Sequence, residues 1–136
     1  MANEVVAKEF FGYTVDFSSI ANGVSATGSV KIEADAWFNM QKLNFFADIA
    51  GAAQTQSSQV IPLVTVQISD SGSGRNMFNQ AIPVPALFGT GQLPFILPTP
   101  KMFKPNSNIS VTIANYSAGT TYRLTLAFLG QKIFMA

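Results

Sequence analysis

Apolar and polar residues alternate with a period of two along most of the chain, and this alternation constrains the fold more than any other feature. Successive side chains of a β-strand point to opposite faces of a sheet, so a strand that covers a core with one face shows this period. The segments with this alternation are 13–17, 30–40, 43–49, 64–68, 109–113 and 122–128. No stretch shows a convincing helical period, so we expect antiparallel sheets and little helix.

Three of these segments carry more detailed expectations. The long alternation over 30–40 predicts one strand with a bend near Ala34–Ala36. A turn-rich segment, 115–120, separates the alternations of 109–113 and 122–128, which predicts a β-hairpin. Gly130 then breaks the period, which predicts a bulge or bend before a last short strand.

About seven or eight strands in a chain of 136 residues predict an all-β fold, an antiparallel two-sheet sandwich that resembles a jelly roll. This length is typical of one domain, so we expect a single β-sandwich over residues 1–136. The residues expected in its core are Ile32, Phe38, Val66, Val111, Leu124 and Leu126.

An irregular, proline-rich and apolar segment at about 76–105 interrupts the strands. Six of the seven prolines lie between 83 and 105, and they hold the segment extended. Two interpretations remain open: a loop folded over the end of its own sandwich, or an arm that lies against other subunits. On the second interpretation the residues in contact with another chain are Phe78, Leu87, Phe88 and Phe95.

Charged residues make up only 11% of the chain, against about 25% in ordinary soluble domains. So few charges cannot cover a normally solvated surface, so we expect much of the exterior to contact protein in a permanent assembly, including a homo-oligomer. A net charge of +1 gives no basic field for nucleic acid. The uncharged stretches 49–69 and 76–100 contain too many polar residues and prolines for membrane helices. We see no secretory signal and expect synthesis in the cytoplasm.

The residue types leave little room for catalysis. With no His and no Cys, the chain lacks the commonest general base, the thiol nucleophile and nearly all zinc ligand sets. Glu33 and Asp35 share the polar face of the expected strand, where we interpret them as solvated. The flexible turn Asp70–Gly74 lacks the further acids of a calcium loop. We therefore expect no enzyme and no catalytic, cofactor-binding or metal-binding residue.

Paired aromatic residues could stack on a sugar or a base. The two pairs are Trp37 with Phe38 and Phe45 with Phe46. In strands, one member of such a pair usually belongs to the core and the other to a second interface, which is the interpretation we adopt.

The second half of the chain resembles small β-sandwich structural proteins from the particles of tailed bacteriophages. The resemblance spans about 60–134 and rests on the order of the segments 62–75, 87–89, 94–100, 103–113 and 122–134. It implies a virion subunit of the capsid decoration (cement) type, and no catalytic residue comes with it.

The function expected on this resemblance is stabilisation of the capsid shell through contacts with other copies and with the major capsid protein or another virion protein. The alternative within the class is a head-tail connector, tail or spike-base component. An alternative of another class is a carbohydrate-binding β-sandwich module, which would use Trp37 and nearby carboxylates.

Overall fold

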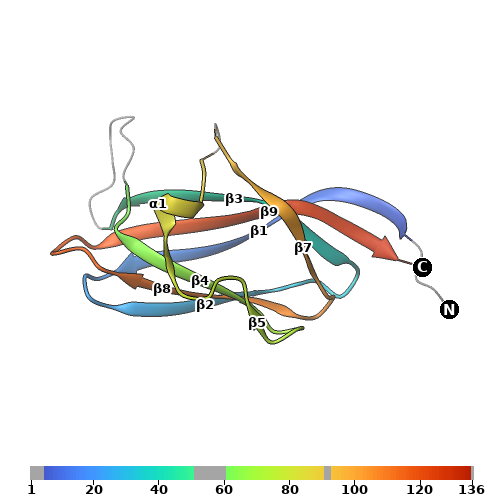
Figure 1. The fold of residues 1–136 in the computed structure, drawn as a ribbon, viewed down its shortest axis with the longest axis horizontal. Coiled ribbons are helices and arrows are strands. Elements are labelled where there is room, and N and C mark those ends of the chain that lie inside the picture. The colour runs from blue at the N-terminus through green and yellow to red at the C-terminus, as the bar shows by residue number, and fades with distance from the viewer. Residues whose placement is uncertain (1–4, 51–60, 91–92, 136) are drawn as a thin grey trace.

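The computed structural model describes residues 5–50, 61–90 and 93–135, and about two thirds of these residues lie in the strands of two antiparallel sheets (Figure 1). The elements are β1 (Val5–Ile20), β2 (Ser25–Lys31), β3 (Trp37–Ile49), β4 (Val64–Asp70), β5 (Arg75–Asn76), β6 (Ile82–Pro83), α1 (Val84–Leu87), β7 (Phe95–Phe103), β8 (Asn108–Asn115) and β9 (Tyr122–Met135). This confirms the predicted all-β, two-sheet sandwich.

The order of the strands is that of a jelly roll. One sheet, called sheet A here, has the order β1-β9-β3-β7, and the other, sheet B, has the order β2-β8-β4-β5 with β6 also on β4. The short strands β5 and β6 pair with opposite ends of β4, on the edge that β8 leaves free, so they act as one interrupted strand. Counted in that way, eight strands form two sheets with the connectivity of a double-sheet jelly roll.

The apolar rows of the two sheets pack against each other and form the core. All six residues that the alternation placed inside are buried, which confirms the phase of those strands. The largest buried side chains include Phe38, Phe103 and Phe128. At one side of the sandwich the sheets come close together at Gly28, where a Cβ atom would meet the side chains of Val15 and Phe17.

The single strand predicted over 30–40 is wrong, because two strands in different sheets occupy it. β2 ends at Lys31 in sheet B and β3 begins at Trp37 in sheet A. The alternation runs through the turn between them because Ile32 and Ala36 also face the core. An inward-facing turn between sheets therefore gives the same sequence pattern as one bent strand.

The hairpin predicted from 109–113 and 122–128 is also wrong. β8 pairs with β2 and β4 in sheet B, whereas β9 pairs with β1 and β3 in sheet A. The buried Asn115 side chain fixes the crossing: its Nδ2 atom donates to the carbonyl oxygens of Ile20 and Thr120, and its Oδ1 atom accepts from Ser117 N. Alternation shows which residues face the core, but it does not show which strand is the neighbour.

The irregularity predicted at Gly130 exists, but the extra residue lies on the neighbouring strand. Met40 pairs with Gly130 and Lys42 pairs with Leu129, so Gln41 of β3 is the extra residue. A Cβ atom at position 130 would overlap the Asn39 carbonyl oxygen, so β3 can bulge towards β9 only because residue 130 is glycine. β9 itself continues to Met135 as one strand.

The proline-rich segment 76–105 is only partly a loop. Its last third is β7, an edge strand of sheet A that pairs with β3 at Ile96 and again at Lys101. The residues between these two pairs, which include Pro98 and Pro100, have no partners on β3. Proline is tolerated there because an edge strand needs hydrogen bonds on one side only.

We expect Leu124→Ala to lower the free energy of unfolding by about 2–5 kcal/mol, because it leaves a cavity between the sheets. Thr112→Ala, on the exposed face of β8, should change it by less than about 0.5 kcal/mol. Urea titration of both variants measures the difference. Similar losses at the two positions would contradict the assignment of inner and outer faces.

Candidate functional site

Phe88, one of the four residues predicted to contact another chain, is a core residue of its own subunit. Its side chain is only 4% exposed, and its ring centroid lies 6.3 Å from that of Phe128 on β9. It cannot act as an exposed anchor, which corrects that part of the prediction. The physical reason is that α1 ends at Leu87, so the chain turns into the sandwich at this point.

The other three residues, Phe78, Leu87 and Phe95, are half-buried and pack against the core of the same chain. The Gln67 side chain fastens the loop, because its Nε2 atom donates to Phe78 O and its Oε1 atom accepts from Phe78 N. The main chain of Gly89 also exchanges hydrogen bonds with Leu43 and Phe45 of β3. The segment is thus held on its own sandwich, and contact of these three residues with another chain stays a prediction.

A different set of apolar side chains lies in water, on the outer face of sheet A. Alternation and the strand register place Phe10, the half-buried Leu129, Phe46, Ile96 and Met102 on this face, which we call the outer apolar face. Polar residues lie between them on the same face, among them Asp16, Lys42, Asn44 and Gln131. Phe10 is 76% exposed, Ile96 63% and Phe46 59%. The expectation that one aromatic residue of each pair faces the core is confirmed for Phe45 and Phe46, since Phe45 packs on the core and Phe46 does not.

The outer face of sheet B has the opposite character. Its outward positions carry short hydroxyl and amide side chains, with Lys31 at one end; they are Ser25, Thr27, Ser29, Thr65, Gln67, Ser69, Ser110 and Thr112. Such groups hydrogen-bond to water without cost, whereas exposed phenyl and aliphatic groups do not. Burial against another surface would therefore be more favourable for the outer face of sheet A than for that of sheet B.

The carboxylates of Glu33 and Asp35 are brought together with a lysine that the sequence analysis missed. They lie in the turn between β2 and β3, and the Lys132 Nζ atom is 3.1 Å from Glu33 Oε1 and 3.3 Å from Asp35 Oδ1. Lys132 is only 7% exposed, and its Nζ atom lies 4.2 Å from the ring centroid of Phe11. The two acids are more than half exposed, as expected for solvated groups, but they are also the partners of this buried cation.

The charges in this cluster favour the protonated, positively charged form of Lys132. Burial by itself would lower the pKa of Lys132, but hydrogen bonds from its Nζ atom to Glu33 and Asp35 and their negative charges raise the pKa above its usual value. A lysine that stays protonated is neither a base nor a nucleophile. The cluster therefore holds the turn between β2 and β3 against β9.

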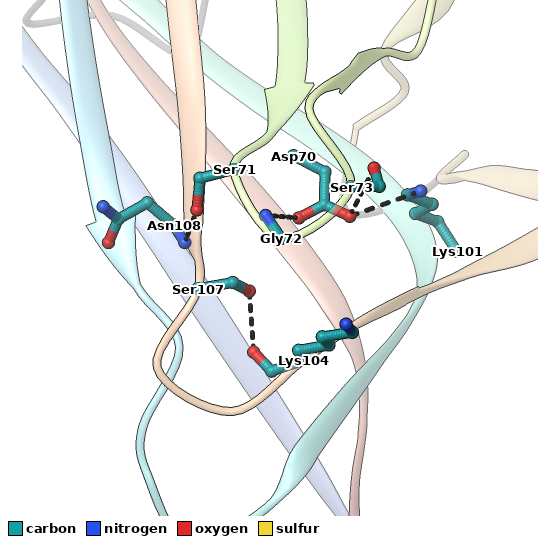
Figure 2. A network of polar contacts seen from close by, with 8 residues as sticks. All are labelled: Asp70, Ser71, Gly72, Ser73, Lys101, Lys104, Ser107 and Asn108. Atoms are coloured by element: carbon teal, nitrogen blue, oxygen red, sulfur yellow. Dashed lines mark hydrogen bonds and ion pairs between the residues drawn. The ribbon is translucent and has the colours of Figure 1, made fainter.

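Asp70 organises the turn between β4 and β5, which was expected to be a flexible segment (Figure 2). The buried carboxylate accepts hydrogen bonds from Gly72 N and Ser73 Oγ, and its Oδ2 atom lies 3.4 Å from Lys101 Nζ on β7. Ser71 Oγ in turn accepts a hydrogen bond from Asn108 N of β8. Asp70 and Ser71 together thus link β4 to β7 and β8 at one end of the sandwich.

Other kinds of site find little support in the parts of the chain that the structure describes. No group of three acidic, His or Cys residues there could hold a metal ion. A hollow of about 330 Å³ beside α1 is lined by Phe45, Ile61, Pro85, Phe88, Gly89, Thr90 and Leu93, none of them charged. Among the same described residues, no helix is long and apolar enough to span a membrane.

Comparisons with known proteins add only a distant likeness. No protein-family model matches the chain, and no curated protein matches it. Among solved structures, the VP2 subviral particle of infectious bursal disease virus matches with a TM-score of 0.41 and 14% identity over 96% of this chain. The chain spans about a third (34%) of the length of that VP2 chain. So distant a likeness assigns neither a family nor a function, and it does not reach the tailed-phage proteins of the expected resemblance.

Replacing Lys132 should lower the free energy of unfolding less than replacing its two acidic partners. Lys132→Met leaves two carboxylates that water can solvate, so we expect a loss of about 1 kcal/mol in the free energy of unfolding. The double variant Glu33→Gln/Asp35→Asn leaves a buried ammonium without a counter-charge and should cost about 3 kcal/mol or more. Urea titration at pH 7 gives both values, and the reverse order would contradict the arrangement described here.

The same ion pairs should weaken at alkaline pH. Because the pKa of Lys132 is higher in the folded chain than in the unfolded one, its stabilisation is complete below about pH 10 and declines as the pH rises through the folded pKa. The stability difference between the wild type and Lys132→Met, measured from pH 8 to 11, should therefore shrink at the upper end. A constant difference would show that the charge of Lys132 does not contribute.

Phe88→Ala should destabilise the subunit itself, because Phe88 is a core residue. We expect it to lower the free energy of unfolding by about 3–5 kcal/mol, because it removes a ring packed against Phe128. Phe46→Ala, on the outer apolar face, should lower it by less than about 1 kcal/mol. Urea titration compares the two, and an unaffected Phe88 variant would place that ring outside the core.

Proposed function

We propose that this chain is a non-enzymatic structural subunit of a virus particle, and specifically a decoration or cement protein on the capsid of a tailed bacteriophage. The observation that carries the proposal is the outer apolar face of sheet A in a chain with only 11% charged residues. Large apolar patches that stay exposed on a folded domain mark protein interfaces. We therefore infer that a permanent protein–protein interface buries the outer apolar face.

The fold is compatible with the proposal without deciding it. Double-sheet jelly rolls occur in viral capsid proteins, and also in lectins and cupins. The resemblance of residues 60–134 to tailed-phage structural proteins favours the viral class. The charged clusters around Lys132 and Asp70 form internal ion pairs, which leaves them without a role in chemistry on a substrate.

The carbohydrate-binding alternative receives less support. It would need an exposed aromatic platform beside carboxylates that are free to bind hydroxyl groups. Trp37 is half-buried, and the nearby Glu33 and Asp35 already contact Lys132. A head-tail connector or tail component uses the same kind of surface as a decoration protein, and copy number separates the two.

Quantitative mass spectrometry of purified particles from the source of the sequence tests the proposal. Hundreds of copies, counted against the major shell protein, are expected for a decoration protein, whereas about a dozen copies would indicate a connector or tail ring. Absence of the chain from purified particles would overturn the structural role altogether.

A binding experiment tests the surface. Phe46→Ser and Ile96→Ser should abolish binding of the recombinant protein to particles that lack it, because each removes an apolar side chain from the outer apolar face. Val24→Ser is the matched control, since Val24 is also exposed but lies in the turn after β1, away from sheet A. Equal loss with all three variants, or none with the first two, would contradict the assignment of this face.

A further inference from the structure

The free edge of β1 is the feature that carries a further inference. β1 forms one edge of sheet A and pairs with β9 on one side only. Within residues 5–50, 61–90 and 93–135, no main-chain hydrogen bond joins its other side to another segment. An edge strand of sixteen residues offers a long row of unpaired main-chain donors and acceptors.

The opposite edge of the same sheet is protected, which makes the open edge of β1 distinctive. β7 carries Pro98 and Pro100, and its residues between Ile96 and Lys101 leave the register with β3. Prolines and bulges are the usual means by which proteins prevent an edge from pairing with another strand. β1 contains no proline, and its register with β9 shifts only near its two ends, between Val5 and Ala7 and between Phe17 and Ile20. One edge of sheet A is thus closed to pairing, and the other is open over residues 8–16.

The outward side chains of β1 are complementary to themselves. They are Lys8, Phe10, Gly12, Thr14 and Asp16, with a positive charge at one end and a negative charge at the other. In its own subunit Asp16 Oδ1 accepts a hydrogen bond from Thr125 Oγ1 and lies 3.8 Å from Arg123 Nε, but the Asp16 side chain is still 47% exposed. A two-fold axis perpendicular to a sheet pairs two copies of one strand in antiparallel fashion and keeps both outer faces on the same side. When that axis passes through Gly12, Lys8 of each copy lies opposite Asp16 of the other, and Phe10 lies opposite Thr14.

The glycine at the centre leaves room for an apolar contact. A Cβ atom on Gly12 would lie 2.8 Å from Leu129 Cδ2, so the Leu129 side chain of β9 leans over this position. Neighbouring strands lie about 4.8 Å apart. The Leu129 side chains of the two copies would therefore meet above the pair of glycines, with an exposed Phe10 on each side of them.

We propose that two copies of this chain pair through β1 in antiparallel fashion, centred on Gly12, and so join their A sheets into one eight-stranded sheet. Main-chain hydrogen bonds supply affinity, and the two Lys8–Asp16 pairs select the register. Centring the axis on Lys8 instead would place the two lysines opposite each other, which is unfavourable. The inference goes beyond the proposed virion role and does not depend on it.

Sedimentation velocity of the isolated protein, together with charge-reversal variants, tests the dimer. Lys8→Asp and Asp16→Lys each place like charges opposite each other twice in the interface, so each should raise the dissociation constant at least ten-fold. The combined variant Lys8→Asp/Asp16→Lys restores opposite charges and should recover most of the affinity. Lys42→Asp is the control, because Lys42 is exposed on the same face but belongs to β3.

Hydrogen exchange of the wild-type protein gives an independent measurement. Dimerisation should protect the outward-pointing amides of residues 8–16 in a concentration-dependent manner, while residues 25–31 at the edge of sheet B remain unchanged. A wild-type protein that is monomeric at 100 µM, reversals without effect, or a combined variant as weak as the single ones would each overturn the pairing. These outcomes concern the isolated chain, so they leave the copy number in particles as a separate test.

Discussion

The exclusion of water from between the two sheets is the constraint on which the rest of the structure depends. Each fully buried valine, leucine, isoleucine, phenylalanine or methionine contributes about 1.5–3 kcal/mol relative to an exposed one, and most of the inward residues are of these types. The phase of the alternation along each strand decides which side chains point away from the core. The outer face of sheet B is rich in hydroxyl groups, whereas the outer face of sheet A keeps exposed aromatic and aliphatic groups. The surface available for function is therefore a consequence of core packing.

The sequence predicted the architecture better than the connections. Alternation identified the inward residues correctly, because burial of one face has a direct signature in the side chains. It failed at 30–40 and at 109–128, where the chain crosses from one sheet to the other while its side chains keep facing the same core. At the second crossing the decisive group is Asn115. Its hydrogen bonds to Ser117 and Thr120 are local, but the one to the carbonyl oxygen of Ile20 depends on tertiary structure.

The surface was predicted less well, for a related reason. Apolar residues in the proline-rich segment led to the prediction that Phe88 contacts another chain, whereas its side chain turns into the core of its own subunit. The exposed residues Phe10 and Phe46 lie at positions where the alternation predicts polar groups, so this mismatch was the available signal. Lys132 was missed because β1, β9 and the turn between β2 and β3 must come together before its partners surround it.

The position of β9 affects how the chain acquires its structure during synthesis. β9 lies between β1 and β3 in sheet A, although it comes last in sequence among the described strands. Until residues 122–135 leave the ribosome, β1 has no partner strand in sheet A, and β3 exposes the edge that β9 later covers. Folding of this sheet must therefore wait for nearly the whole of the given sequence, as expected for a topology rich in distant contacts. During that wait the nascent chain is open to pairing with other chains, and chaperones that shield strand edges would matter most at this stage.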